Sequence, residues 1–192
     1  MKKFPAVFLD RDGVIIRQVD LPQKESDLKI LPGAAEGIAL INKLGYFVVI
    51  VSNQPVVARG LITLREAHRL NKVLATRLAK RGARIDAEYL CPHHPQADMK
   101  KYRISCTCRK PAPGMILQAA REHGLDLKSS FMIGDSTQDV QMGNRAKVKM
   151  ILVKTGHAGK DPWQHKGVPD FVAKDLQAAA KVIARIKKRD LR

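Results

Sequence analysis

The chain has 192 residues, a length that suits one domain and leaves little room for a second. Hydrophobic residues make up 45% of the chain and charged residues 28%, which is the balance of a globular protein. No apolar run approaches the roughly 20 residues that a membrane-spanning helix needs. The short apolar stretch near the N-terminus runs directly into Asp10 and Asp12, so we expect no signal peptide and a cytoplasmic protein.

The chain is strongly basic, with 35 Lys and Arg against 18 Asp and Glu, a net charge of +17. Such a charge attracts polyanions, which include nucleic acid and phosphorylated small molecules. Aromatic residues make up only 5% of the chain, which argues against the stacking platforms of single-strand binders. We therefore interpret most of the basic excess as solvated surface. We expect a phosphorylated small molecule as partner, rather than nucleic acid or a membrane, and a monomeric protein.

Strand and helix patterns alternate along the chain. In chain order we predict a strand over 4–9, a helix over 34–44, a strand over 46–51, a helix over 63–81, a strand over 85–91, a helix over 113–123, a strand over 131–133, a helix over 137–145, a strand over 150–153, an edge strand over 170–172 and a helix over 176–188. Thr63 can cap its helix, and Glu66 fits a capping box. The alternation predicts an α/β fold with a Rossmann-like parallel sheet covered by helices on both faces, in a single domain over residues 1–192.

Polar residues stand where three of the predicted strands end. Asp10 and Asp12 follow the first strand, Ser52 and Asn53 follow the second, and Asp135 follows the fourth. The carboxyl ends of parallel strands form one edge, where ligands bind. We therefore expect these side chains to converge. Because three carboxylates offer hard oxygen donors, the set suits Mg²⁺.

Lys110 adds a cation to this edge, just before a predicted helix that Pro111 and Pro113 delimit. Carboxylates, magnesium, a lysine and a hydroxyl at a strand end are the parts of phosphoryl transfer. A lone Asp-x-Asp is more often a pair of turn-forming acids. The further segments 51–54, 109–111 and 134–139, in this order, favour the catalytic interpretation.

These motifs resemble those of the haloacid dehalogenase-like phosphohydrolases. Residues 8–14, Phe-Leu-Asp-Arg-Asp-Gly-Val, are similar to the nucleophile loop of that family, and Ser52, Lys110 and residues 134–139 are similar to its other three motifs. A closer resemblance is to the D-glycero-D-manno-heptose 1,7-bisphosphate 7-phosphatases and the similar histidinol-phosphatases. It is carried by residues 52–54, 58–60, 91–95 and 106–115. The resemblance implies a haloacid dehalogenase-like fold without a large cap domain.

The resemblance implies a role for each acid. Asp10 would attack phosphorus and become an aspartyl phosphate. Asp12 would protonate the leaving oxygen and later take a proton from the attacking water. Asp10, the backbone carbonyl of Asp12, and Asp135 would hold Mg²⁺. Asp139 would orient the fourth motif rather than contact the metal.

The resemblance also implies the groups that bind substrate. Ser52 and Lys110, with help from Asn53, would contact the transferring phosphoryl oxygens. Arg109 would contact the rest of the substrate. Ser136 stands where the family often has a lysine, which removes one positive charge near the metal. With no large cap insertion we expect an open site, lined by residues 18–31 and by the loop around 91–108.

The implied substrate is a sugar bisphosphate of carbohydrate metabolism that supplies lipopolysaccharide precursors. Two alternatives stay open at this point. A histidinol-phosphatase would use the same chemistry on a cationic amine, which is a poor match to a chain of +17. A nucleic-acid-associated phosphatase would use the basic helices to hold a phosphate backbone.

Cys91 and His93 are followed, after twelve residues, by Cys106 and Cys108. Four soft ligands in two close pairs suit a closed, structural Zn²⁺ site, which would fix the loop over 91–108 beside Arg109 and Lys110. His94 is the rival ligand to His93, and three free cysteines are the alternative to a metal. The remaining histidines are interpreted as ordinary surface or loop residues: His68, His123, His157 and His165.

Overall fold

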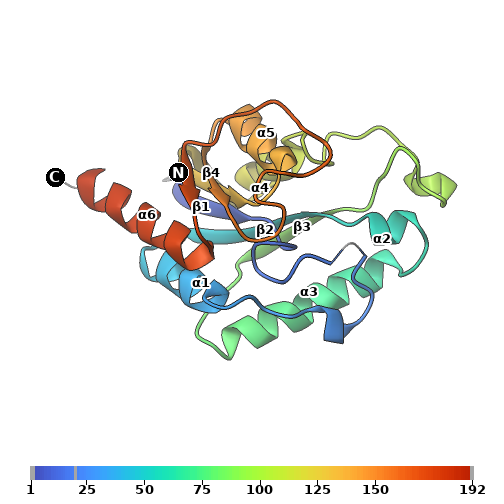
Figure 1. Ribbon diagram of the computed structural model, residues 1–192, viewed down its shortest axis with the longest axis horizontal. Coiled ribbons are helices and arrows are strands. Elements are labelled where there is room, and N and C mark those ends of the chain that lie inside the picture. The colour runs from blue at the N-terminus through green and yellow to red at the C-terminus, as the bar shows by residue number, and fades with distance from the viewer. Residues whose placement is uncertain (1–2, 20, 191–192) are drawn as a thin grey trace.

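The structure is a computed structural model that describes residues 3–19 and 21–190. Its centre is a six-stranded, all-parallel sheet in the order β3-β2-β1-β4-β5-β6 (Figure 1). The strands are β1 (Phe4–Leu9), β2 (Phe47–Asn53), β3 (Ala87–Cys91), β4 (Leu125–Gly134), β5 (Lys149–Val153) and β6 (Phe171–Ala173). The α-helices are α1 (Ala34–Lys43), α2 (Pro55–Ala58), α3 (Leu64–Ala79), α4 (Gly114–His123), α5 (Thr137–Ala146) and α6 (Leu176–Asp190).

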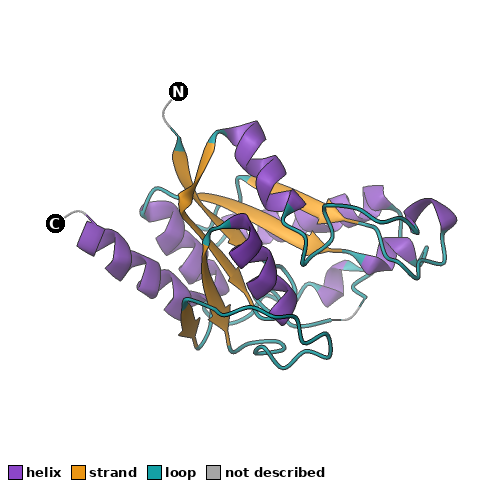
Figure 2. Cartoon of the chain, turned by 90° about the horizontal axis from the view of Figure 1, so that it is seen from above, coloured by secondary structure: helices purple, strands orange, loops and turns teal. Residues whose placement is uncertain are grey.

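Helices cover both faces of the sheet, as Figure 1 and the view from above in Figure 2 show. One buried apolar cluster joins the sheet to α1, α3 and α6, through residues such as Ile38, Leu74 and Ile183. A second cluster joins the other face to α4 and α5, through residues such as Ile116 and Met142. The predicted fold class, a parallel sheet between two helical layers, is confirmed.

The order in which successive strands are added to the sheet changes direction at β1. It runs from β1 outward through β2 to β3 and then crosses back to β4 on the other side of β1. In a doubly wound sheet, such a reversal opens a crevice at the carboxyl ends of the two central strands. Asp10 follows β1, and Asp135 follows β4, so the topology places both acids at this crevice.

Strand β4 is longer than the predicted strand over 131–133. It begins at Leu125, where its first residues pair with Phe4 and Pro5 before a shift in register. Within this segment the Ser130 hydroxyl accepts a hydrogen bond of 2.8 Å from the Ala6 N–H. The polar residues that precede Phe131 thus belong to an irregular strand, and a search for continuous apolar runs misses it.

Two local predictions have different outcomes in the structure. Thr63 caps α3 as expected, since its side chain accepts a hydrogen bond from the Glu66 N–H at 3.1 Å. The Glu66 carboxylate does not complete a capping box and instead pairs with Arg69 at 2.9 Å. The short helix α2 was not predicted, because its four residues begin at a proline and carry no helical period.

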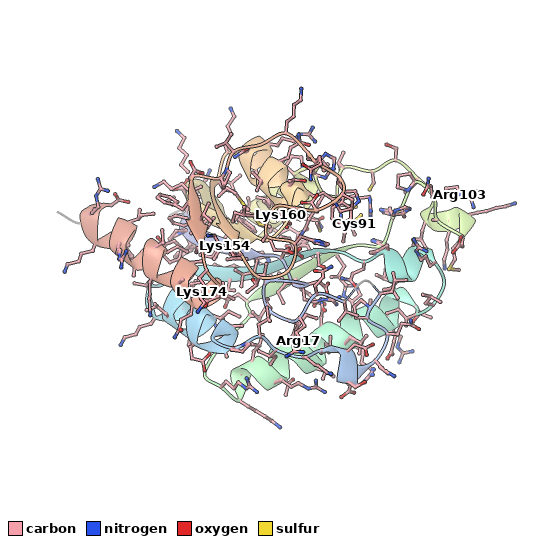
Figure 3. The ribbon with its side chains drawn as sticks, viewed as in Figure 1. Arg17, Cys91, Arg103, Lys154, Lys160 and Lys174 are labelled. Atoms are coloured by element: carbon pink, nitrogen blue, oxygen red, sulfur yellow. The ribbon has the colours of Figure 1, made fainter. Side chains whose placement is uncertain are left out.

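None of the helices described here is long and apolar enough to cross a bilayer. The basic side chains labelled in Figure 3 lie outside the helices and strands, and two of them share the loop between β5 and β6. They are Arg17, Arg103, Lys154, Lys160 and Lys174. The positive charge is therefore spread over distant segments, as the sequence indicated.

Candidate active site

A cavity of about 530 Å³ opens at the carboxyl edge of the sheet. It brings together every residue that the sequence assigned to catalysis or phosphate binding. The lining residues are Asp10, Asp12, Gln18, Val19, Leu21, Ser52, Asn53, Pro55, Arg59, His94, Arg109, Lys110, Asp135, Ser136, Gln138, His157, Pro162 and Trp163. The loop over 18–31 contributes Gln18, Val19 and Leu21 as expected, while Asp20 in that range lies outside the described residues.

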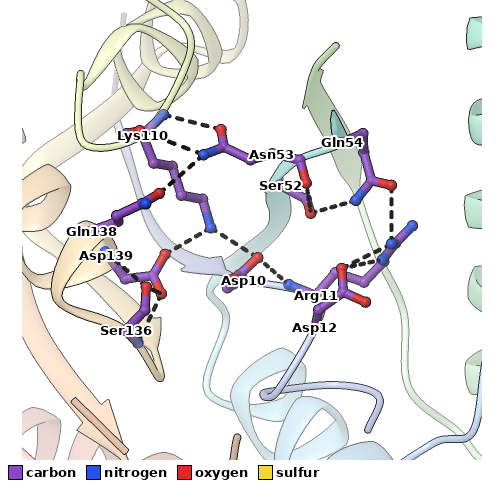
Figure 4. Close-up of polar contacts among 10 residues, drawn as sticks. All are labelled: Asp10, Arg11, Asp12, Ser52, Asn53, Gln54, Lys110, Ser136, Gln138 and Asp139. Atoms are coloured by element: carbon purple, nitrogen blue, oxygen red, sulfur yellow. Dashed lines mark hydrogen bonds and ion pairs between the residues drawn. The ribbon is translucent and has the colours of Figure 1, made fainter. Parts of the chain in front are cut away.

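Three carboxylates meet on one side of the cavity. Asp10, Asp135 and Asp139 each offer an oxygen that lies within 4.8 Å of the others. The Lys110 ammonium lies between two of them, 2.8 Å from Asp10 and 2.7 Å from Asp139 (Figure 4). Three carboxylates against one ammonium leave this buried cluster short of positive charge. Hard oxygen donors with that deficit fit a divalent cation such as Mg²⁺.

The pKa values of the acids also reflect this shortage of positive charge. Burial, followed by repulsion from Asp139 and Asp12, raises the pKa of Asp10 to about 7, although Lys110 opposes the shift. Burial and repulsion from Asp139 and Asp10 raise the pKa of Asp135 to about 8. Burial disfavours the charge on Lys110, but Asp10 and Asp139 outweigh it and raise the pKa of this ammonium. A bound cation would favour the ionised form of both acids.

Two glycines make room for the Asp135 carboxylate. A Cβ added to Gly13 or to Gly156 would strike this carboxylate, and both residues have a positive φ, 79° and 62°. The His157 N–H then donates a hydrogen bond of 2.6 Å to Asp135 Oδ2. The backbone at Gly13 and Gly156 therefore approaches the Asp135 carboxylate more closely than residues with a Cβ would allow.

Asn53 connects β2 to the lysine of the third motif. Its Oδ1 accepts a hydrogen bond of 3.0 Å from the Lys110 N–H, and its Nδ2 donates to Gln138 Oε1 at 3.2 Å. Ser52 lies beside it in the cavity wall, and its hydroxyl accepts a hydrogen bond of 2.8 Å from Gln54 Nε2. Asn53 thus positions Lys110, a contact that sequence reasoning did not foresee.

Arg11 is fully buried, and its guanidinium binds Asp12. Its Nε and Nη2 donate to Asp12 Oδ2 at 3.1 and 2.8 Å. Its remaining contacts are to Asn71 Oδ1 at 2.9 Å and Gln54 Oε1 at 3.0 Å. The Asp12 carboxylate is therefore fixed within the nucleophile loop by Arg11 (Figure 4). It is not one of the three acids in the cluster. We predicted no role for Arg11 from the sequence, because an arginine in a loop is normally exposed.

The four predicted soft ligands lie together, on β3 and the loop that follows it. One ligand atom from each of Cys91, His93, Cys106 and Cys108 lies within 4.8 Å of the others. The Cys108 Sγ is 3.0 Å from that of Cys91 and 3.3 Å from His93 Nδ1. This compact set of three thiols and one imidazole fits the tetrahedral coordination of Zn²⁺. His94, the rival ligand, lines the large cavity instead.

Electrostatics within the thiol cluster already favour a thiolate. Hydrogen bonding with Cys91 first, and then with His93 and Cys106, lowers the pKa of Cys108 to about 5 against the opposing effect of burial. The reciprocal hydrogen bond and burial raise the pKa of Cys91. Since thiolates are the form that binds zinc, the cluster is prepared for a soft cation.

Three basic side chains gather on the cavity wall: Arg59, His94 and Arg109. Burial lowers the pKa of His94, and the charges of Arg109 and Arg59 lower it further. Arg109 Nη1 donates to the His93 carbonyl at 2.9 Å, which ties this guanidinium to the thiol cluster. The cavity is thus lined by a cluster of acidic side chains and by a cluster of basic side chains. Arg59, from the 58–60 segment, had no assigned role in the sequence interpretation.

A third segment also lines the cavity, and the sequence did not predict it. His157, Pro162 and Trp163 line the cavity from the loop after β5, whereas the sequence marked His157 as an ordinary loop residue. The segment carries no motif and begins more than twenty residues after the acid to which it binds, and so only the fold brings it here.

Comparisons of the sequence with known proteins also match it to hydrolases. The sequence model of a family described as HAD-hydrolase-like matches residues 107–179. A D-glycero-beta-D-manno-heptose-1,7-bisphosphate 7-phosphatase of Photorhabdus laumondii is 42% identical over 153 residues, 79% of this chain and 81% of that protein. A D-glycero-D-manno-heptose-1,7-bisphosphate 7-phosphatase of Thermosynechococcus vestitus is 38% identical over 186 residues, 93% of this chain and 95% of that protein.

A solved structure resembles the whole chain. The D,D-heptose 1,7-bisphosphate phosphatase of B. bronchiseptica, complexed with magnesium and phosphate, has a TM-score of 0.83 and 33% sequence identity. The match covers 95% of this chain and 99% of that one. The fold and the acidic cluster therefore define a hydrolase of the haloacid dehalogenase-like class. Within that class, the chain belongs to the family of the D-glycero-D-manno-heptose-1,7-bisphosphate 7-phosphatases.

Proposed function

We propose that this protein is a magnesium-dependent phosphatase that removes the 7-phosphate of D-glycero-D-manno-heptose 1,7-bisphosphate. The observation that carries the proposal is the group of Asp10, Asp135, Asp139 and Lys110 in one cavity. The names of the relatives supply the substrate. A heptose bisphosphate also matches a cavity that is lined by basic side chains as well as by acids.

In the proposed reaction Asp10 attacks the phosphorus atom, and the phosphoryl group passes to its carboxylate as an aspartyl phosphate. Asp12, fixed by Arg11, gives a proton to the departing sugar oxygen. Asp12 then takes a proton from the water that hydrolyses the aspartyl phosphate. Because Asp12 is two residues after Asp10 in the chain and lines the same cavity, one residue serves both steps.

Lys110 and Ser52 bind the oxygens of the transferring phosphoryl group in this proposal. Lys110 is 4% exposed, and Asp10 and Asp139 hold its ammonium in place, so this group needs little reorganisation when phosphate arrives. Asp10, the backbone carbonyl of Asp12, and Asp135 would hold Mg²⁺. The ion would offset the negative charge that accumulates between the acids and the phosphate.

The second phosphate of the substrate would contact the basic side of the cavity. Arg109 and Arg59 lie on that side and jointly lower the pKa of His94, which reflects their proximity. A guanidinium suits phosphate oxygens because its fork donates two parallel hydrogen bonds. A bisphosphate would thus place one phosphate at the acids with the metal and the other at the arginines.

We further propose that Cys91, His93, Cys106 and Cys108 hold one structural Zn²⁺. The distances between the thiols and the imidazole support four-coordinate binding with no free position. Cys108 directly precedes Arg109 and Lys110. The bound metal would therefore fix the segment that delivers both cations to the cavity.

A panel of phosphate esters tests the substrate assignment. We expect kcat/KM for heptose 1,7-bisphosphate, measured on both anomers with magnesium, to exceed that for histidinol phosphate at least tenfold. DNA with a 3′-phosphate is included to test the alternative of a nucleic-acid-associated phosphatase. Faster turnover of histidinol phosphate or of DNA would contradict the substrate, and no turnover of any ester would contradict the phosphatase.

A further inference from the structure

Trp163 is the only tryptophan of the chain, and it lines the wall of the active-site cavity. Trp163 lies outside the helices and strands, and its side chain is 49% exposed, which is a large fraction for an indole. Its ring meets that of His157 edge-on, with 5.5 Å between the centroids and 74° between the planes. Pro162 adds a third apolar surface beside them. We refer to His157, Pro162 and Trp163 as the aromatic wall.

The aromatic wall is attached to the acidic cluster at its first residue. The His157 N–H donates to Asp135 Oδ2 at 2.6 Å, and the Gly159 N–H donates to the Asp135 carbonyl at 2.7 Å. The start of this loop is therefore fixed to a residue that we assign to the metal. Its position depends on the same contacts that orient Asp135.

A second attachment lies just before Trp163. Asp161 is fully buried, and its carboxylate accepts hydrogen bonds from the Thr137 N–H at 2.5 Å and the Thr137 hydroxyl at 2.6 Å. The same hydroxyl accepts a hydrogen bond from the His165 N–H at 3.0 Å. The loop is thus bound to the start of α5 on both sides of Trp163. The backbone on both sides of the half-exposed indole is therefore fixed, and the ring itself packs on His157.

The aromatic wall differs chemically from the acids and the basic side chains of the cavity, and it adds to the apolar surface of Val19, Leu21 and Pro55. The acids surround the reacting phosphate, and the arginines suit the second phosphate, but neither group recognises the carbon skeleton between the phosphates. Binding sites for small molecules usually combine a few polar groups with an apolar or aromatic surface. A sugar ring presents such a surface where its C–H bonds gather on one face.

We propose that Trp163, supported by His157, is a specificity-determining residue that packs against the sugar ring of the substrate. This inference rests on the proposed function, because it assumes a phosphorylated sugar at the acidic cluster. In this proposal the aromatic wall makes the protein select sugar phosphates over acyclic phosphate esters. Asp161 acts as a positioning residue for the wall.

Intrinsic fluorescence tests the contact directly, since Trp163 is the only indole. The Asp10→Asn protein, which binds without turnover, is titrated with heptose 1,7-bisphosphate in the presence of magnesium. We expect a saturable change in indole emission. Glycerol 1-phosphate, which has no ring, should produce a smaller change at saturation. Emission that stays constant while the substrate binds, as measured by calorimetry, would overturn the proposal.

Steady-state kinetics test the selectivity. Trp163→Ala should lower the ratio of kcat/KM for the bisphosphate to kcat/KM for glycerol 1-phosphate roughly tenfold, mainly through KM. Trp163→Phe, which restores a ring, should recover most of that ratio. Val168→Ala is the matched control, because Val168 is 78% exposed and does not line the cavity. We expect this control to leave both constants unchanged.

The outcomes separate the inference from the proposed function. If the wild-type protein hydrolyses the bisphosphate and Trp163→Ala keeps the selectivity ratio within twofold, the aromatic wall has no role in specificity. If the wild-type protein hydrolyses no phosphate ester, the proposed function itself is wrong. Thermal unfolding of each variant shows whether a lost ratio accompanies a lost fold. Because Trp163→Phe keeps the ring, a folded Phe variant with the low ratio of the Ala variant would also contradict packing against the sugar.

Discussion

Replacing Arg11 by methionine should destabilise the protein far more than the loss of an ordinary surface arginine. The Arg11 guanidinium is fully buried and donates four hydrogen bonds to three side chains. Methionine has a similar length but no donors. The substitution therefore leaves the Asp12 carboxylate and the amide oxygens of Gln54 and Asn71 without their partner.

The size of the effect follows from these contacts. Removing one partner of a buried ion pair costs about 3–5 kcal/mol. The Asp12 side chain keeps 14% of its surface exposed, so water can reach part of it and the lower end of the range applies. A loss of about 3 kcal/mol corresponds to a fall in Tm of roughly 6–12 °C for a domain of this size.

Circular dichroism with heating and with urea measures this loss against a matched control. Arg69→Met removes an arginine that pairs with Glu25 and Glu66 but is 49% exposed, and its loss should change the stability far less because surface ion pairs contribute little. In the Arg11→Met background, Asp12→Asn should recover part of the stability, because it removes the orphaned charge. Equal losses from Arg11→Met and Arg69→Met would refute the reasoning.

Three further predictions concern the metals and the nucleophile. Asp10→Asn should lower turnover at least roughly a thousandfold with an unchanged far-UV spectrum; phosphate release at the wild-type rate would remove Asp10 as nucleophile. Gly156→Ala should raise the magnesium concentration for half-maximal activity about tenfold, because the new Cβ strikes Asp135; an unchanged magnesium curve would contradict the close fit. Elemental analysis should find one zinc per chain in protein purified with reductant and much less in Cys108→Ser, whereas equal zinc in both would exclude this ligand set.

The sequence was sufficient to predict the strands that place the catalytic edge. The apolar runs that became β1 and β2 are continuous and end in polar residues, and the structure confirms that Asp10 and Ser52 follow them into one cavity. The pairing of Cys91 and His93 with Cys106 and Cys108 was equally readable, because metal ligands must be close in space and often recur in short pairs. The single domain over 1–192, the monomeric state and the cytoplasmic location stay predictions.

Other parts of the site were not readable from the sequence, because they depend on contacts between distant segments. The role of Arg11 depends on Asn71, which is 60 residues away in the chain. The aromatic wall depends on Asp161, which reaches back 24 residues to Thr137. No local period or motif marks such contacts, since the residues acquire their meaning only when the loops fold against the sheet.

The central claim is that this acidic cluster, with magnesium, hydrolyses one particular phosphate of a sugar bisphosphate. The most direct measurement is ³¹P NMR of heptose 1,7-bisphosphate incubated with the protein, with and without magnesium. We predict that the resonance of the 7-phosphate is replaced by that of inorganic phosphate while the 1-phosphate persists, and only when magnesium is present. Loss of the 1-phosphate first, or equal hydrolysis after magnesium is chelated, would contradict the account.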